Sequence, residues 1–196
     1  MEKYSKSNKR TSVEAKYVDE VVTEEAVAVE PVAKKPTTTK FDKVNFQTPK
    51  NVVKKMLGAV KLKPNDILMN ACAGKGSILE EFPPNNPYLA VESNPNNCRI
   101  LKNHGFSVEC LDFLEYNDRK AHVIFIVPPL GNSELLLISK AWETIYDGGT
   151  VVALFSQELE SSFPEWLILN SKIYPITDKF FSDNNLHVKM LVAKRG

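Results

Sequence analysis

The sequence predicts an α/β fold with a mostly parallel, doubly wound sheet, and two observations lead to this prediction. From residue 41 onward, short apolar runs typical of strands alternate with segments of helical periodicity. Strands that alternate with helices are joined by right-handed crossovers, so they lie parallel to one another. In addition, the apolar run Ile67–Asn70 leads into the turn Gly74–Gly76 and then into a helix.

The predicted strands are short apolar runs bounded by polar or turn-forming residues. In chain order they are Ile67–Asn70, Tyr88–Glu92, Ser107–Cys110, His122–Val127, Thr150–Ser156, Lys172–Phe181 and His187–Ala193.

The predicted helices precede or connect these strands. Thr48 and Pro49 suit the cap and the first position of a helix that runs to about Val60. Further helices are predicted at Ser77–Phe82, Pro95–Asn103 and Ser133–Tyr146, the last of them ended by Asp147–Gly149, with a shorter helix near Phe163.

Length and composition limit the class of protein. A chain of 196 residues with 43% hydrophobic residues is long enough for one domain with a sizeable core and a tail. A net charge of +1 provides no overall attraction to nucleic acid, so any such contact requires a local basic patch. Cys72, Cys98 and Cys110 lack the spacing of metal ligands, so we expect no metal.

The first 40 residues differ in composition from the rest. Met1–Arg10 is polar and basic, and Glu24–Ala33 is of low complexity. Because large apolar residues do not recur at a regular period, we expect residues 1–40 to be a disordered tail and residues 41–196 to fold. Two interpretations of the tail stay open: a solvated tether, or an arm that docks onto a protein partner.

The sequence predicts no contact with a membrane. No apolar run approaches the ~20 residues that cross a bilayer. The polar beginning of the chain does not resemble a signal peptide. We therefore expect an intracellular, cytoplasmic protein.

Three features at the ends of predicted strands indicate a ligand that contains adenosine. Ligands of parallel sheets bind outside the carboxyl ends of the strands, where the turn Gly74–Gly76 lies. Glu92 ends the next strand, where a carboxylate can accept from both ribose hydroxyls, and Asp112 follows the third, where it can accept from the adenine amine. The alternative is a tight turn and two surface acids. Leu79 replaces the third glycine of the dinucleotide pattern, which disfavours NAD.

Several further motifs follow one another in a characteristic order. They are Phe46–Leu57, Ala73–Ser77, Gly105–Tyr116, Lys140–Glu143, Gly148–Ala153 and Phe163–Leu167. In this order they resemble class I S-adenosylmethionine-dependent methyltransferases, in particular the small N6-adenine DNA methyltransferases of phages and plasmids. The resemblance covers nearly all of residues 44–194. It implies a Rossmann-like methyltransferase domain at residues 41–196, with a C-terminal antiparallel hairpin and a phage or plasmid origin.

The resemblance also implies S-adenosylmethionine as the cofactor and assigns the residues that bind it. In the family, the Phe-x-Thr-Pro segment closes over the methionine part of the cofactor, and the glycine motif usually begins with an acid. This chain has Asn70 in place of that acid, so we expect weaker binding. The cofactor-binding residues so assigned are Thr48, Pro49, Asn70, Ala73, Gly74, Lys75, Gly76, Glu92 and Asp112.

The predicted catalytic run departs from the family pattern. It reads Val127-Pro128-Pro129-Leu130, where the family has Asn or Asp, two prolines and an aromatic residue. In the family the first residue accepts hydrogen bonds from the reacting amine, and the aromatic ring stacks on the flipped base. Losing such an acceptor costs ~10²–10³ in rate, and losing the stacking partner weakens base binding by ~1–3 kcal/mol. The two prolines also suit the simple end of a buried strand.

Two hypotheses for the function therefore stay open. The first is a methyltransferase that binds nucleic acid and methylates an exocyclic amine, adenine N6 in DNA. The second is an inactive pseudo-methyltransferase that serves as a binding or scaffolding subunit of a larger assembly, joined through residues 1–40.

Overall fold

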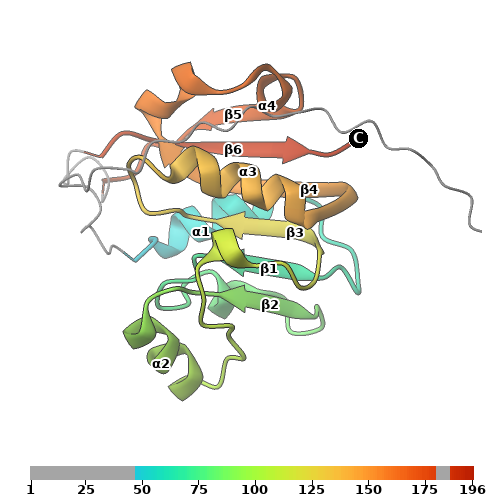
Figure 1. Ribbon diagram of the computed structural model, residues 1–196, viewed down its shortest axis with the longest axis vertical. Coiled ribbons are helices and arrows are strands. Elements are labelled where there is room, and N and C mark those ends of the chain that lie inside the picture. Colours follow the sequence, from blue (N-terminus) through green and yellow to red (C-terminus); the bar gives the residue numbers. More distant parts are fainter. Residues whose placement is uncertain (1–46, 180–185) are drawn as a thin grey trace, which may run out of the picture. The chain divides into compact units, whose positions relative to one another are not determined.

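The computed structural model describes residues 47–179 and 186–196, all within one compact unit, Pro36–Gly196. The predicted tail at residues 1–40 lies outside the described residues. Within the described part of the chain, six strands form one sheet in the order β2-β1-β3-β4-β6-β5 (Figure 1). The strands are β1 (Leu68–Ala71), β2 (Tyr88–Val91), β3 (Ala121–Ile126), β4 (Ile145–Ser156), β5 (Ser171–Pro175) and β6 (Val188–Lys194).

The pairing of the strands confirms the predicted fold class. β2, β1, β3 and β4 lie parallel to one another. β6 lies antiparallel between β4 and β5, so the last two strands form the expected C-terminal antiparallel hairpin. The sheet is therefore the mostly parallel, doubly wound sheet that the alternation of elements predicts.

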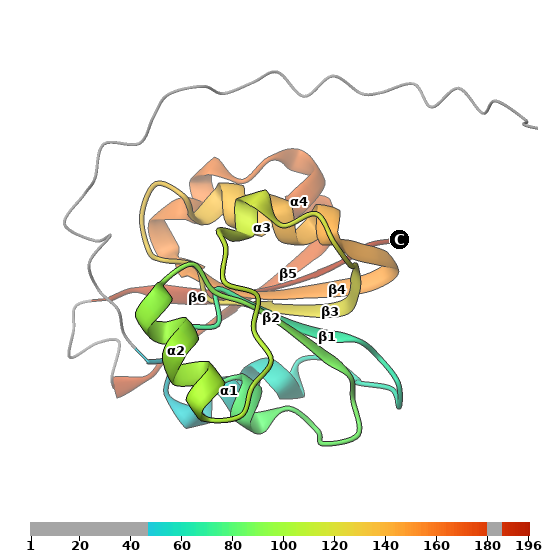
Figure 2. The same cartoon turned by 60° about the horizontal axis from the view of Figure 1, so that its bottom comes forward.

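Helices cover both faces of this sheet. The α-helices are α1 (Lys50–Gly58), α2 (Pro95–Asn103), α3 (Glu134–Thr144) and α4 (Glu165–Leu169), and the shorter 3₁₀ turns are η2 (Leu79–Glu81), η3 (Phe113–Glu115) and η4 (Gln157–Ser162). Figure 2 shows α3 and α4 on one face and α1 and α2 on the other. No helix within the described ranges has both the length and the apolar character that a membrane crossing requires.

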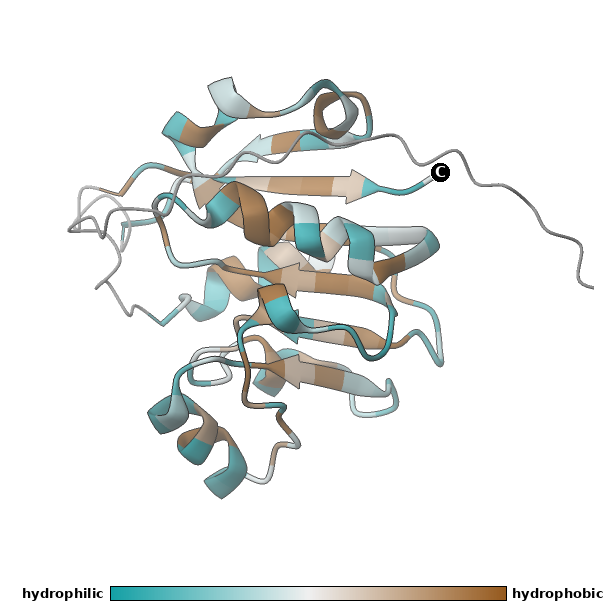
Figure 3. Ribbon diagram, viewed as in Figure 1, coloured by the Kyte–Doolittle hydropathy of each residue, from teal (hydrophilic) through white to brown (hydrophobic). Residues whose placement is uncertain are grey.

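The core lies between the sheet and these helices. Ile124 of β3 belongs to the same buried cluster as Ile138 of α3, whereas its neighbour Phe125 belongs to a cluster with Met56 of α1. Successive residues of a strand point to opposite faces, so a central strand covered on both sides is apolar throughout. Figure 3 shows this concentration of hydrophobic residues in the strands.

Two predicted elements are shorter than expected. The helix predicted at Ser77–Phe82 is only the 3₁₀ turn η2, because Phe82 precedes two prolines and adopts an extended ψ of 139°. The strand predicted at Ser107–Cys110 is a single parallel bridge between Val91 and Glu109. Gly105, with a positive φ, ends the preceding helix shortly before this bridge.

Several element ends also differ from the prediction, among them those of α1, β4 and β5. The helix α1 is capped by Pro49 rather than Thr48, because the Pro49 carbonyl accepts from the N–H groups of Val52 and Val53. β4 begins at Ile145, earlier than predicted. β5 ends at Pro175, which has no N–H to donate to a neighbouring strand.

Adjacent leucines in α3 provide a test of the core. Leu137 is 5% exposed and Leu136 is 53% exposed. Leu137→Ala is expected to lower the free energy of unfolding by about 2–5 kcal/mol, because it leaves a cavity. Leu136→Ala is expected to change it by about 0.5 kcal/mol or less. Urea unfolding measures both, and equal losses would contradict the packing of α3.

Candidate functional site

The carboxyl ends of β1, β2, β3 and β4 lie at one edge of the sheet because these strands are parallel (Figure 1). The connections that leave these ends carry most of the predicted site residues. Open parallel sheets bind their ligands at this edge. The site is therefore built from the turn after β1, the end of β2, the segment near Asp112 and the run after β3.

The glycine turn after β1 has backbone conformations that favour glycine. The φ angles of Gly74 and Gly76 are 57° and 97°. A Cβ atom at Gly76 would lie 2.8 Å from Cδ2 of Leu101, so α2 packs directly against this residue. A Cβ atom at Gly74 would meet nothing within 4 Å. Gly76 is thus packed against α2. Gly74 is open, so a ligand can approach the backbone there.

Glu92 fixes the glycine turn to the end of β2. Its carboxylate is buried, and its Oε2 accepts from Gly74 N–H at 2.7 Å. Its Oε1 accepts from Asn94 N–H at 2.7 Å, and the Asn94 side chain in turn caps α2. A carboxylate has about four acceptor sites, so both oxygens of Glu92 keep capacity for a ligand hydroxyl.

A cavity of about 120 Å³ lies beside the carboxyl ends of β1 and β2 and the run after β3. Its lining residues are Cys72, Val91, Ser93, Leu111, Asp112, Phe113, Leu114, Pro129, Ser133 and Leu137. Asp112 is exposed, and its Oδ1 accepts from Leu114 N–H at 3.0 Å. Burial, and after it the charges of Glu92 and Asp112, raise the pKa of the Cys72 thiol to about 12. The cavity is therefore largely apolar, with a carboxylate at its wall and a protonated thiol.

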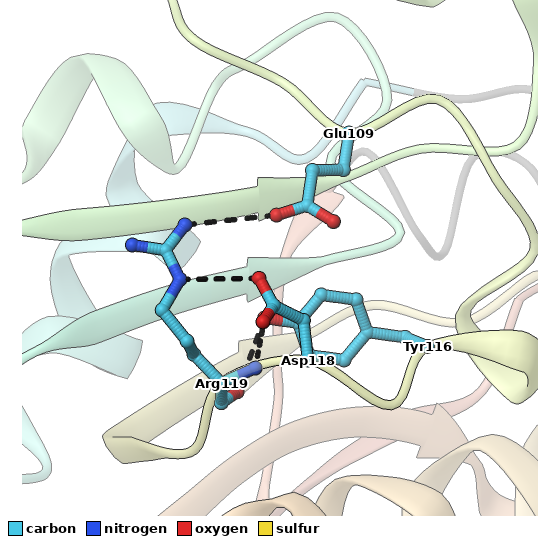
Figure 4. A network of polar contacts seen from close by, with 4 residues as sticks. All are labelled: Glu109, Tyr116, Asp118 and Arg119. Atoms are coloured by element: carbon cyan, nitrogen blue, oxygen red, sulfur yellow. Dashed lines mark hydrogen bonds and ion pairs between the residues drawn. The ribbon is translucent and has the colours of Figure 1, made fainter.

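A network of polar contacts anchors the segment that carries Asp112 (Figure 4). The Tyr116 hydroxyl donates to the Arg119 carbonyl and accepts from its N–H, both at 3.1 Å. The Arg119 guanidinium pairs with Asp118 at 3.2 Å and with Glu109 at 3.7 Å. Burial of the Tyr116 ring is the main cause that raises the pKa of its hydroxyl. The contacts thus join the segment to Arg119, shortly before β3, and to Glu109, which pairs with Val91 of β2.

Asn70, at the predicted start of the glycine motif, contributes a buried acceptor without a partner. Its side chain is 1% exposed and its Nδ2 donates to the carbonyls of Phe125 at 3.2 Å and Ala71 at 3.4 Å. Its Oδ1 has no hydrogen-bond partner. Because an unpaired buried acceptor costs ~1–3 kcal/mol, this oxygen favours a ligand that carries a donor.

Thr48 and Pro49 lie beside the glycine turn. Both residues line a hollow of about 330 Å³ together with Ser77, which directly follows the turn. At the rim of the hollow, Lys50 of α1 pairs with Glu81 at 2.7 Å. The structure therefore brings the predicted methionine-side residues next to the glycine motif.

The four residues of the predicted catalytic run have different environments. Pro129 is exposed and lines the 120 Å³ cavity, whereas Pro128 is buried. Leu130 is 5% exposed and belongs to the buried cluster that also contains Leu186. Val127 is half-buried against the same cluster. The run thus presents Pro129 to the cavity and places Leu130 in the core.

Glu134 is a site residue that the sequence analysis missed. It is 1% exposed, and its Oε1 accepts from Gly131 N–H at 2.7 Å and from the Ser156 hydroxyl at 2.8 Å. Its Oε2 accepts from Ser156 N–H at 2.6 Å. The carboxylate therefore joins the turn after the catalytic run to the end of β4. Glu134 is spaced from Leu137, Ile138 and Ala141 as residues on one face of a helix are, so it lies on the buried face of α3. This spacing is the signal in the sequence that could have identified Glu134.

The sequence has no match among known families or curated proteins, whereas the fold is similar to that of solved structures. TrmN from Thermus thermophilus is similar with a TM-score of 0.61 at 14% identity, over 84% of this chain and 55% of that one. Precorrin-6y C5,15-methyltransferase from Geobacter metallireducens has a TM-score of 0.58 at 15% identity, over 82% and 94% of the two chains.

A further similar structure contains the cofactor. The 16S rRNA N2 G1207 methyltransferase RsmC from T. thermophilus, in complex with AdoMet and guanosine, has a TM-score of 0.56 at 14% identity. The match covers 74% of this chain and 39% of that one. This chain thus spans little more than half of TrmN and well under half of RsmC. Together these similarities show that the chain has the fold of class I S-adenosylmethionine-dependent methyltransferases.

Replacing Glu134 tests its role as a link between loops. Glu134→Ala leaves the N–H groups of Gly131 and Ser156 unpaired, so the free energy of unfolding is expected to fall by about 2–4 kcal/mol. The exposed Glu143 in the same helix is the matched control, and Glu143→Ala is expected to cost about 0.5 kcal/mol or less. Urea unfolding measures the free energy of unfolding of both variants. A loss in Glu134→Ala no greater than in Glu143→Ala would refute the role of Glu134 in joining Gly131 to Ser156.

Proposed function

We propose that this protein is an S-adenosylmethionine-dependent methyltransferase that acts on an exocyclic amine of a nucleic-acid base. One observation carries the proposal: at the carboxyl edge of a class I methyltransferase fold, Glu92 accepts from the glycine turn at Gly74, and Asp112 lines a cavity with Cys72 and Ser93, which lie close to Gly74 and Glu92 in the chain. The order of these groups along the chain is the one that the resemblance to N6-adenine methyltransferases implies.

The described residues fit an adenosine-containing cofactor. Asp112 would accept from the adenine amine at the wall of the 120 Å³ cavity. Glu92 would accept from the ribose hydroxyls with the acceptor capacity that its two backbone contacts leave. This cavity is smaller than the ~300–1,000 Å³ of typical ligand sites, so the base would lie in it and the remainder outside.

The methionine part would lie on the other side of the glycine turn. Asn70 Oδ1, an acceptor without a partner, suits the ammonium group of an amino acid. Thr48 and Pro49 line the hollow beside Ser77 and would cover this part of the cofactor. When bound, the cofactor supplies an electrophilic methyl group, and the chain supplies its position relative to the substrate.

The run after β3 would orient the substrate amine. Pro128 keeps a main-chain carbonyl that can accept a hydrogen bond from the amine, and Pro129 lines the cavity. Val127 adds no acceptor, so we expect slow transfer.

Adenine N6 in DNA is the substrate that the resemblance implies, and RNA is the alternative to be assayed beside it. The named target of RsmC, N2 of a guanosine in rRNA, is also an exocyclic amine. In both DNA and RNA, the proposed substrate is therefore the exocyclic amine of a base that has been flipped out of its stack.

Calorimetric titration with S-adenosylmethionine and S-adenosylhomocysteine tests the cofactor site. We expect micromolar dissociation constants for the full chain. Glu92→Gln is expected to weaken binding about 10–100-fold, because a hydrogen bond to a charged acceptor contributes ~1.5–3 kcal/mol. Glu143→Gln, at an exposed glutamate of α3, is the matched control and should bind like the parent chain. No binding at millimolar ligand would contradict the proposed function.

The catalytic run is tested by restoring the family's acceptor. Val127→Asn is expected to raise methyl transfer to DNA or RNA oligonucleotides by up to ~10²-fold, because it supplies the missing acceptor. Val127→Leu changes the volume without adding an acceptor and should show no gain. Transfer of labelled methyl groups from S-adenosylmethionine is the measurement. If both variants bind the cofactor and neither transfers a methyl group, the chain is a binding module rather than an enzyme.

A further inference from the structure

Cys98 and Cys110, two of the three cysteines, lie on the two segments that follow β2, which are α2 and residues 107–112. Cys98 is on the inward face of α2, where it is 4% exposed, and Cys110 is exposed on the following segment. Val108 of that segment packs in the same apolar cluster as Leu101, one helical turn after Cys98. Side chains alternate along an extended backbone, so Cys110 lies on the same side as Val108. Both thiols therefore lie between α2 and residues 107–112.

Backbone contacts bring the two thiols together. Glu92 N–H donates to the Glu109 carbonyl at 3.0 Å, which places Cys110 beside the end of β2. The Cys98 thiol donates to the Glu92 carbonyl at 3.2 Å. The Cys110 thiol donates to the Val108 carbonyl of its own segment at 4.0 Å. Its proximity to Cys98 contributes to the raised pKa of the Cys98 thiol. These contacts hold the segments of the two cysteines side by side, the arrangement that a disulfide between them requires.

The two thiols differ in accessibility. Burial, and after it the neighbouring Cys110, raises the pKa of Cys98 to about 12. Cys98 is consequently protonated near neutral pH and shielded from solvent. Cys110 is exposed, so reaction with an external disulfide begins there.

We propose that Cys98 and Cys110 form a reversible redox pair, which a low-molecular-weight disulfide such as oxidised glutathione converts into an intramolecular disulfide. The Cys110 thiolate attacks one sulfur of glutathione disulfide, and one glutathione leaves as a thiolate. The Cys98 thiol then loses its proton to water, and its sulfur attacks Sγ of Cys110, which releases the second glutathione. The two protein thiols lose two protons and two electrons, and glutathione disulfide takes up the two electrons.

The disulfide would change the surroundings of the adenosine-binding residues, a consequence that rests on the proposed function. Glu92 loses the thiol donor to its carbonyl when Cys98 is oxidised. Asp112 lies two residues after Cys110, on the segment that the disulfide ties to α2. We therefore expect oxidation to weaken the binding of S-adenosylmethionine.

The experiment titrates the full chain with glutathione redox buffers, alkylates the remaining free thiols and maps the peptides by mass spectrometry. The expected product is a Cys98–Cys110 cross-link, lighter than the reduced chain by two hydrogens and reversed by dithiothreitol. Its rate should rise with pH, because both attacking groups are thiolates. A stable glutathione adduct on Cys110, with Cys98 still open to alkylation, would overturn the proposal.

Single substitutions complete the test. Cys110→Ser must abolish the cross-link, whereas Cys72→Ser, which removes the cysteine of the cavity, must leave it unchanged. Cys98→Ala must leave Cys110 as a mixed disulfide with glutathione, which checks the order of the two steps. Any other pattern of products contradicts the assignment.

Calorimetry of reduced and oxidised protein tests the link to the cofactor site. We expect the dissociation constant of S-adenosylmethionine to rise about fivefold or more on oxidation, the lower range of coupling between sites. An unchanged constant in fully cross-linked protein would overturn the coupling. Reduced protein that fails to bind the cofactor contradicts the proposed function, while the mass spectrum still decides the disulfide.

Discussion

Two buried carboxylates hold the ends of the strands together at the candidate site. Glu92 accepts from the N–H groups of Gly74 and Asn94, and so joins the turn after β1 to the start of α2. Glu134 accepts from the N–H and the hydroxyl of Ser156, and so joins the start of α3 to the end of β4. Buried N–H groups in loops need acceptors, and charged acceptors give short, strong hydrogen bonds. The connections at this edge of the sheet are therefore fixed before any ligand arrives.

This construction gives Glu92 two roles in the proposed site. Two of its acceptor positions are occupied by backbone N–H groups, which fix the orientation of the carboxylate. A ribose would add hydrogen bonds to a group that is already in place, so little side-chain entropy would be lost on binding. The same contact couples the glycine turn to α2, where Cys98 lies. Structural support and the proposed binding of the ribose thus involve the same side chain.

Much of this edge could be predicted from the sequence, because its residues follow strands with clear apolar periods. The mostly parallel sheet, the glycine turn and the positions of Glu92 and Asp112 after their strands came from local patterns. Glu134 was missed because a charged residue at the start of a helix is usually exposed, and only its tertiary partners make burial favourable. The bridge at Glu109 was predicted as a full strand because sequence patterns do not reveal how many residues find a pairing partner.

Val127 and Leu130, the two positions of the predicted catalytic run that depart from the family pattern, differ in burial. Val127 is half-buried, so a polar side chain there keeps access to solvent or to a substrate. Leu130 is 5% exposed in the cluster beneath α1, and an aromatic ring at this position would overpack the core at a cost of ~1–3 kcal/mol. The packing of α1 against the sheet therefore disfavours an aromatic residue at position 130. The same packing does not disfavour a hydrogen-bond acceptor at position 127. A base that enters this site would therefore have to stack on a residue other than Leu130. Pro129 is exposed and lines the cavity, so its ring is the part of the run on which a base could stack.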